Sequence, residues 1–366
     1  MSDEDKIYRE LQQHLDELPI GFPATESGIE IRLLRHFFSP EEAAIAMKLS
    51  RRFEPLSVIH ERLKETGISI EQLEKYLDRM VSKGGLHVKK NGEKSYANAM
   101  LSIGMYEHKV NQFSGEFLGD LGGYFMEEFG REFSRTQIPQ LRTIPIEESV
   151  SRELHIAPYD ELEKIILDSK GPFAVQYCAC RTTKELMGDP CKTTSRKETC
   201  LTLGTEARMY IDEGWAREVT KEELLDILQQ NQADGLVLQP GNYLNPQFWC
   251  SCCGCCCGIL GRIKFLPKPI DFFATNYHVV IDSSTCTGCE ACIERCPTGA
   301  LSMVESISLV NLDQCIGCGL CVPICSEGSI QLIKNEEEVI PPQTKEDLHD
   351  KILAEKIELV QKEKEK

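Results

Sequence analysis

Two matching runs of cysteines near the C-terminal end of the chain carry its strongest chemical signal. The first reads Cys286-x-x-Cys289-x-x-Cys292-x-x-x-Cys296, and the same spacing begins again at Cys315. Each iron of a cubane 4Fe–4S cluster takes one thiolate, so eight cysteines at these spacings match the needs of two such clusters. The pattern therefore indicates electron transfer through bound clusters.

The spacing also predicts which cysteines act together. Two intervening residues let three successive thiolates converge on one cluster, whereas the fourth cysteine lies one turn further on and points toward the other cluster. We therefore expect two interleaved ligand sets. The first set is Cys286, Cys289, Cys292 and Cys325, and the second is Cys296, Cys315, Cys318 and Cys321. A pair of zinc sites is the alternative, although four-ligand zinc sites rarely interleave in this way.

Residues 276–335 resemble the bacterial two-cluster ferredoxins, and the internal duplication extends beyond the cysteines. Gly288 matches Gly317, and Gly299 matches Gly328. Glycine at such positions lets backbone N–H groups turn toward cluster sulfurs. The resemblance implies two 4Fe–4S clusters held between short strands.

The apolar runs at 278–281, 307–312 and 329–333 are suited to those strands. The two copies differ after their last cysteine, where the first has Pro297 and the second has Ser326. This difference leaves the ligands intact and affects only how one cluster is shielded.

A second cysteine-rich region lies upstream. Its first part contains four cysteines, the number that one further cubane requires: Cys178, Cys180, Cys191 and Cys200. Arg181 and neighbouring lysines give this segment a small excess of positive charge, which would raise the potential of a cluster there. A zinc site or unrelated structural thiols are the alternatives.

The second part of this region has six cysteines within eight residues: Cys250, Cys252, Cys253, Cys255, Cys256 and Cys257. Packed thiolates repel one another unless a metal neutralises them, so metal ligation is favoured. The tandem Cys-Cys-Gly resembles the motifs that hold noncubane clusters in the catalytic subunit of heterodisulfide reductases, where they lie far apart in sequence. We expect instead that some of the six bind one further cubane, and sharing of ligands between the two parts remains open.

The first hundred residues predict a winged-helix-like domain, namely three helices followed by a hairpin. Ser39 and Ser69 begin capping boxes, and Asn91-Gly92 favours a type I′ turn. The expected third helix, from Ser69, carries three acidic side chains against two basic ones, whereas a helix that reads DNA is normally basic. A protein-contact or scaffolding role is therefore preferred over DNA binding.

The remaining segments complete a multi-domain α+β protein. We expect an aromatic-rich helical connector at 101–170, an α-rich cysteine-binding region at 171–275 and a charged, solvated helical tail at 336–366. The aromatic residues of the connector are interpreted as core. A partner-docking role for the apolar side of the tail is the less favoured reading.

Composition narrows the functional classes. The formal charge of −17 disfavours nucleic acid and favours basic docking patches on redox partners. No apolar run is long enough for a secretory signal or a membrane span, so we expect a soluble cytoplasmic protein. Exposed cubanes are oxygen-labile, which favours an anaerobic cell. No dinucleotide fingerprint or phosphate-binding loop is present.

These features favour an electron-transfer protein or redox subunit that links donor and acceptor oxidoreductases. Residues 100–335 as a whole resemble uncharacterised ferredoxin-like proteins of anaerobes. A cluster-dependent redox regulator that uses the winged-helix-like head is one alternative. The other is disulfide-reductase-like catalysis at the tandem Cys-Cys-Gly.

Overall fold

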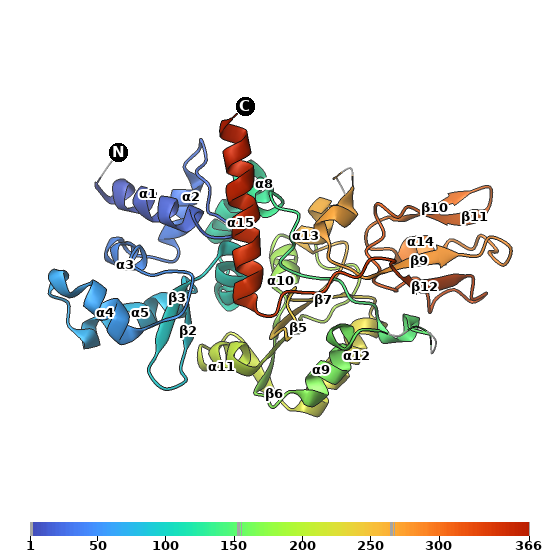
Figure 1. Ribbon diagram of the computed structural model, residues 1–366, viewed down its shortest axis with the longest axis horizontal. Helices are drawn as coiled ribbons and strands as arrows, with labels where there is room; N and C mark the ends of the chain where they lie inside the picture. Colours follow the sequence, from blue (N-terminus) through green and yellow to red (C-terminus); the bar gives the residue numbers. More distant parts are fainter. Residues whose placement is uncertain (1–2, 152–153, 155, 264–265, 267, 366) are drawn as a thin grey trace. The chain divides into compact units, whose positions relative to one another are not determined.

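The chain forms two compact units. The computed structural model describes residues 3–151, 154, 156–263, 266 and 268–365 (Figure 1). Unit 1 comprises Met1–Thr136, Arg208–Ala216 and His349–Lys366, and unit 2 comprises Gln137–Ala207 and Arg217–Leu348. All eighteen cysteines belong to unit 2.

The first hundred residues of unit 1 form helices and then a small sheet. In chain order the elements are α1 (Asp3–Asp16), α2 (Ile29–Arg35), α3 (Pro40–Ala46), β1 (Glu54–Pro55), α4 (Leu56–Arg62), α5 (Ile70–Ser82), β2 (Leu86–Lys89) and β3 (Ser95–Asn98). The sheet has the order β1-β3-β2, with antiparallel neighbours. The expected order of helices and hairpin is thus present, with one additional short strand before α4.

Two of the expected helix starts are confirmed, and the expected turn is wrong. Ser39 and Ser69 each form a complete capping box, with Glu42 and Gln72 respectively. In the hairpin, Lys89 pairs with Ser95, so residues 90–94 form a longer loop. Gly92 has φ +83°, whereas Asn91 does not adopt the positive φ that a type I′ turn also requires there.

Aromatic side chains pack the rest of unit 1, as expected. Its elements are α6 (Tyr106–His108), α7 (Gly115–Tyr124), the π-helix η4 (Phe125–Phe129) and α8 (Gly130–Phe133). The rings of Tyr106 and Phe113 stack 5.3 Å apart, and Phe22 lies 4.9 Å from Tyr124.

The expected connector at 101–170 is divided between the units after Thr136. Its second half contains the short 3₁₀ helices η5 (Glu147–Ser149) and η6 (Pro158–Asp160) and the helix α9 (Leu162–Asp168).

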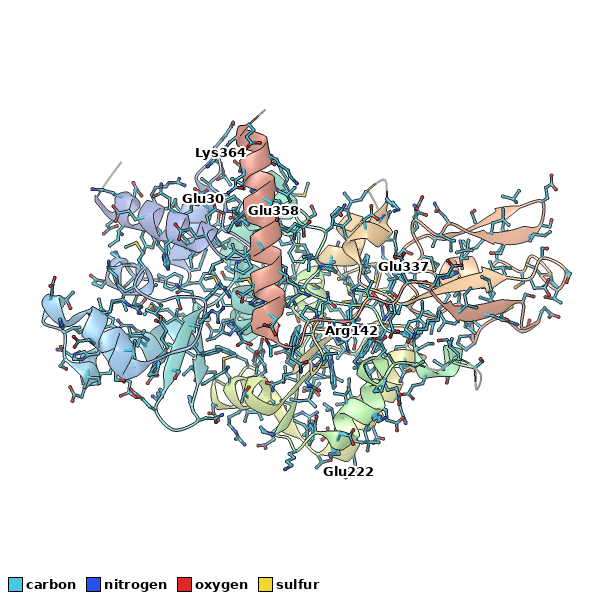
Figure 2. All side chains as sticks on the ribbon, viewed as in Figure 1. Glu30, Arg142, Glu222, Glu337, Glu358 and Lys364 are labelled. Carbon is cyan, nitrogen blue, oxygen red and sulfur yellow. The ribbon has the colours of Figure 1, made fainter. Side chains whose placement is uncertain are left out.

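The C-terminal tail forms the helix α15 (Lys345–Lys364), but the helix is not solvated all round. Ile352 is fully buried, and the Lys356 ammonium pairs with the Glu132 carboxylate at 2.6 Å. Glu358 and Lys364 of the same helix are exposed (Figure 2). The expectation of a solvated tail is therefore wrong. One narrow side of the helix is buried, although the charged residues along the tail alternate in sign.

Unit 2 is built on a five-stranded antiparallel sheet with the order β6-β4-β5-β8-β7. Its strands are β4 (Phe173–Tyr177), β5 (Glu198–Leu203), β6 (Arg217–Val219), β7 (Val237–Pro240) and β8 (Phe248–Cys252). Its helices are α9, α10 (Ala179–Leu186), α12 (Lys221–Ala233), α13 (Gly258–Ile263) and the start of α11 (Gly204–Asp212). An α-rich region at 171–275 is therefore not what forms. Strands such as β7 are buried on both faces and lack the alternating pattern that marks a strand in sequence.

Two strand pairs follow the sheet in unit 2. β9 (Tyr277–Ile281) pairs with β12 (Ile330–Lys334), and β10 (Leu301–Val304) pairs with β11 (Ile307–Val310). The short helix α14 (Ala291–Arg295) lies between β9 and β10 in the chain. The strands expected around the cysteine repeat are confirmed.

Candidate iron–sulfur and metal centres

The cysteine repeat encloses two cavities, each lined by one of the expected ligand sets. Cys286, Cys289, Cys292 and Cys325 line the first cavity, which we call the outer site. Cys296, Cys315, Cys318 and Cys321 line the second, the inner site. Apolar residues complete the walls, including Ile281 and Ile330 at the outer site and Val279 and Leu301 at the inner site. Four converging thiols in an apolar shell fit the requirements of a 4Fe–4S cluster at each site.

Left-handed backbone conformations recur at matching positions of the two loops. Gly288 and Gly317 have φ +70° and +66°. A Cβ atom at Gly317 would collide with the Tyr277 carbonyl, so the second position requires glycine for space as well as for φ. The next matched pair is Glu290 and Gly319, with φ +64° and +73°. The shared conformation shows that the duplication in sequence is a duplication in structure.

Backbone amides donate to the thiols. The Ala300 N–H donates to Cys296 Sγ at 3.2 Å, and the Ser308 N–H donates to Cys286 Sγ at 3.5 Å. Such bonds stabilise thiolate charge and help to set the potential of a bound cluster. Burial raises the pKa of the Cys315 thiol, so iron binding at the inner site releases a proton.

The two sites differ in their surroundings. Cys289 of the outer site is exposed. At the inner site, the Cys318 carbonyl accepts a hydrogen bond from the Ile146 N–H at 3.1 Å, and a Cβ atom at Gly319 would collide with Ser149. The inner loop is therefore packed against the remainder of unit 2, whereas the outer loop reaches solvent.

Comparison with known families agrees with this geometry. Residues 278–326 match the 4Fe-4S dicluster domain. The chain thus contains a ferredoxin-like iron–sulfur domain. No match was found among the curated proteins or among the solved structures. Within the described part of the chain, no helix has the length and apolarity to cross a membrane.

The ten cysteines upstream of the dicluster domain form two groups in space, and neither group follows the order of the chain. Six of them form a closed ring of side-chain interactions, which we call the thiol ring. In ring order its members are Cys178, Cys180, Cys257, Cys252, Cys250 and Cys200. The thiol ring combines residues from both parts of the upstream sequence region.

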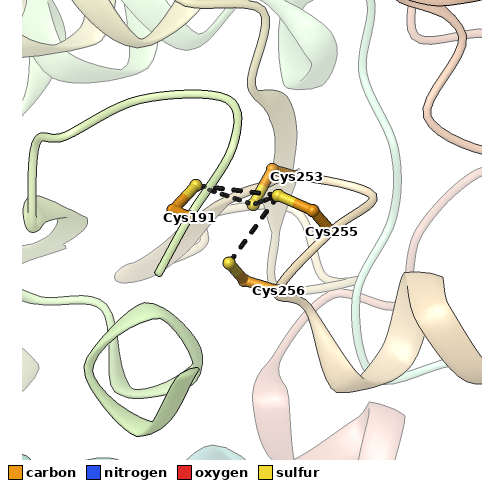
Figure 3. A group of neighbouring side chains, drawn as sticks. All are labelled: Cys191, Cys253, Cys255 and Cys256. Atoms are coloured by element: carbon orange, nitrogen blue, oxygen red, sulfur yellow. Dashed lines mark hydrogen bonds between the residues drawn. The ribbon is translucent and has the colours of Figure 1, made fainter. Parts of the chain in front are cut away.

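The other four cysteines form a tighter group, the thiol quartet (Figure 3). It comprises Cys191, Cys253, Cys255 and Cys256, whose sulfur atoms all lie within 4.8 Å of one another. Burial raises the pKa of the Cys255 thiol, but hydrogen bonds from the Thr193 hydroxyl and the Lys192 backbone N–H outweigh it and lower the pKa to about 6. Cys255 is thus ready to act as a thiolate ligand at neutral pH.

Each Cys-Cys pair of the tandem motif is split between the two groups. Cys252 belongs to the ring and Cys253 to the quartet, while Cys256 belongs to the quartet and Cys257 to the ring. In extended chain, successive side chains point to opposite sides, which explains the division at the end of β8. The same periodicity places Cys250 and Cys252 together in the ring.

The expected first ligand set, Cys178, Cys180, Cys191 and Cys200, is therefore not brought together. Cys191 joins the quartet because its loop, between α10 and β5, lies against residues 253–256. The structure instead brings thiols from the two distant segments together, an arrangement that the sequence left open. It arises because β5 and β8 are neighbours in the sheet.

The sequence did not indicate that Arg181 is buried beside the thiol groups. It is only 3% exposed, and it donates to Thr199 Oγ1 at 2.5 Å and to the Ser251 carbonyl at 2.9 Å. Burial lowers its pKa, but the neighbouring thiols Cys178 and Cys253 outweigh burial and raise it. Arg181 therefore places a permanent positive charge beside both groups.

Proposed function

We propose that the protein transfers electrons between partner oxidoreductases through its dicluster domain and a further redox centre held by the thiol ring. The observation that carries this proposal is the continuity of packing between the two regions. Cys318 of the inner site packs against the same hydrophobic core that contains Cys252 and Cys257 of the ring. A bound iron–sulfur cluster supplies one-electron storage and transfer.

The fold determines the order of the proposed redox centres and surrounds them with apolar side chains. Cys289 gives the outer site contact with solvent, where a partner can dock. Ile316 and Leu320, both buried, belong to the apolar core against which Cys318 packs. Trp249, 1% exposed, belongs to the same core. These buried apolar residues provide surroundings of low polarity for the core shared by Cys318 and the ring.

The charges on the protein favour electron transfer in the same direction, from the outer site to the ring. Arg181 beside the ring favours a more reduced state there, which raises the potential of a centre at the ring relative to one without this charge. The formal charge of −17 favours partners whose docking surfaces are basic. We therefore propose entry at the outer site and a partner-specific terminus at the ring.

Counting electrons tests this proposal. Full-length protein, purified without oxygen, is titrated with reduced methyl viologen while the cluster absorbance is followed. The dicluster domain accounts for about two electrons per chain, one for each cubane. We expect uptake above this value, and we expect Cys252→Ser to return it to about two. Wild-type uptake of two or fewer would show that the ring holds no redox centre.

For the N-terminal residues 1–100 we propose a winged-helix-like domain that contacts protein rather than DNA. The succession β1-α4-α5-β2-β3 supports this likeness. Two of the three hairpin lysines, Lys90 and Lys94, are already in ion pairs. Lys94 contacts Glu74 and Asp78 at 2.8 and 2.7 Å, and Lys90 contacts Glu213 at 3.1 Å. Neither lysine is available to neutralise phosphate without giving up these partners.

We expect no useful affinity for duplex DNA. In fluorescence anisotropy at 50 mM salt, the dissociation constant should exceed about 10⁻⁴ M, the weak end of non-specific binding. Glu74→Gln, which frees part of the charge of Lys94, is the matched comparison and should bind no more weakly than wild type. Micromolar, salt-dependent binding by the wild-type protein would instead support a DNA-binding regulator.

A further inference from the structure

We infer that the thiol quartet binds a single Zn²⁺ ion and not an iron–sulfur cluster. This inference is independent of the proposed electron-transfer function. It rests on the distances between sulfur atoms, the closed set of four ligands and the position of the quartet in the fold.

The sulfur–sulfur distances in the quartet are those around one ion. With a Zn–S distance of about 2.3 Å, a regular tetrahedron has edges of about 3.8 Å. Cys191 Sγ lies 3.6 Å from Cys253 Sγ and 3.7 Å from Cys255 Sγ. Cys255 Sγ lies 3.5 Å from Cys253 Sγ and 3.7 Å from Cys256 Sγ (Figure 3). Four of the six edges are therefore close to the length expected for one tetrahedral ion.

The dicluster domain provides a comparison within the same chain. A cubane places four irons and four sulfides between its thiolates and therefore holds them further apart than one ion does. Among the described residues, neither the eight dicluster cysteines nor the thiol ring contains three thiols that all lie within 4.8 Å of one another. Among the cysteines that the structure describes, the quartet alone has the compact arrangement of a single-ion site.

The ligand set is closed, and groups around it stabilise thiolate charge. All four ligands are cysteines, which is the composition of structural zinc sites that leave no coordination position open for a substrate. Thr193 Oγ1 lies 3.4 Å from Cys255 Sγ, and the Lys192 N–H donates to the same sulfur. Donors of this kind orient metal ligands and spread the negative charge of a four-thiolate site.

The position of the quartet gives the ion a structural task. The loop at 187–197, between α10 and β5, has no regular secondary structure and is mostly exposed. Its apolar support is a small satellite cluster that consists of Leu236 and the quartet itself. A metal ion there would tie this loop to residues 253–256 with a strength that so few apolar contacts do not provide. Because the adjacent Cys252 and Cys257 belong to the ring, the ion would also hold the ring closed on this side.

Metal analysis of full-length protein tests the inference. The protein is expressed with excess iron and purified without oxygen, so that zinc does not enter merely because iron is scarce. We expect about one zinc per chain, and we expect Cys255→Ser to lose it while iron and acid-labile sulfide stay unchanged. Cys289→Ser, in the outer site, is the matched control and should lose iron but keep zinc. Loss of about four irons from Cys255→Ser would show a cluster, and loss of one iron would show mononuclear iron; either result overturns the assignment.

A spectroscopic measurement on the wild-type protein covers the case in which Cys255→Ser fails to fold. Zinc K-edge X-ray absorption should show four sulfur neighbours at about 2.3 Å and no nearby iron. Nitrogen or oxygen neighbours, or iron at short range, would contradict binding by the quartet alone. Absence of zinc from the wild-type protein would overturn the inference directly.

Discussion

Cys318→Ser is expected to remove the 4Fe–4S cluster of the inner site, and with it about four of the irons of the protein. Cys318 lines the inner cavity and also packs against the core that contains two cysteines of the thiol ring. The loss of this cluster should therefore lower the iron content and also interrupt electron transfer between the outer site and the ring. The measurements are iron and sulfide analysis, followed by freeze-quench paramagnetic resonance of the ring after mixing with a reduced protein donor.

Cys289→Ser is the matched control for this prediction. It should lose the same amount of iron, but from the outer site, whose loop reaches solvent. The two variants should then differ in the step of electron transfer that they slow. Cys289→Ser should slow electron transfer between the protein and a partner. Cys318→Ser should stop electron transfer between the outer site and the ring. Reduction of the ring at the wild-type rate in Cys318→Ser would contradict the route proposed through the inner site.

The second large effect concerns stability. Arg142 (Figure 2) and Asp160 form an ion pair at 3.1 Å in which both side chains are only 3% exposed. The Arg142 guanidinium also donates to the carbonyls of Gly241 and Tyr243, each at 2.8 Å. Arg142→Met leaves a buried carboxylate and two buried carbonyls without this partner. We expect unit 2 to lose about 3–5 kcal/mol of stability, because removing one member of a buried pair leaves the other charge uncompensated.

The loss should depend on pH. Burial raises the pKa of Asp160 above its ordinary value, and Arg142 opposes that rise. Without Arg142 the pKa of Asp160 rises further. A carboxyl group whose pKa is raised by folding contributes its stability below its unfolded pKa and loses it as pH increases through the folded pKa. The destabilisation by Arg142→Met should therefore be smaller at pH 5 than at pH 7.5.

Thermal unfolding followed by circular dichroism measures this effect, with an expected decrease of about 10 °C in the apparent midpoint at neutral pH. Arg217→Met is the matched control, because Arg217 makes exposed ion pairs with Glu198 and Glu223 in the same unit. Exposed pairs contribute at most about 1 kcal/mol, so this variant should change little. Equal losses in the two variants would show that burial of the Arg142–Asp160 pair has no special effect.

Local sequence determined the dicluster domain. Its ligands lie in two short loops with a repeated spacing, and each loop adopts the same left-handed conformations at Gly288 and Gly317. The capping boxes at Ser39 and Ser69 and the strands around the repeat could likewise be predicted, because their signals lie within a few residues. Geometry of this kind depends on spacing along the chain and little on distant parts of it.

Tertiary structure decided the grouping of the other ten cysteines. Cys191 meets Cys253 across 62 positions, and this contact exists only because β5 and β8 pair in the sheet. The sheet itself could not be predicted from the sequence, because strands buried on both faces lack the alternation of apolar and polar residues that marks a strand. The buried side of α15 was hidden in the same way, because Ile352 and Lys356 find their partners in distant segments. Spacing thus determined which cysteines of the repeat act together, whereas strand pairing decided which upstream thiols form a ring and which form a quartet.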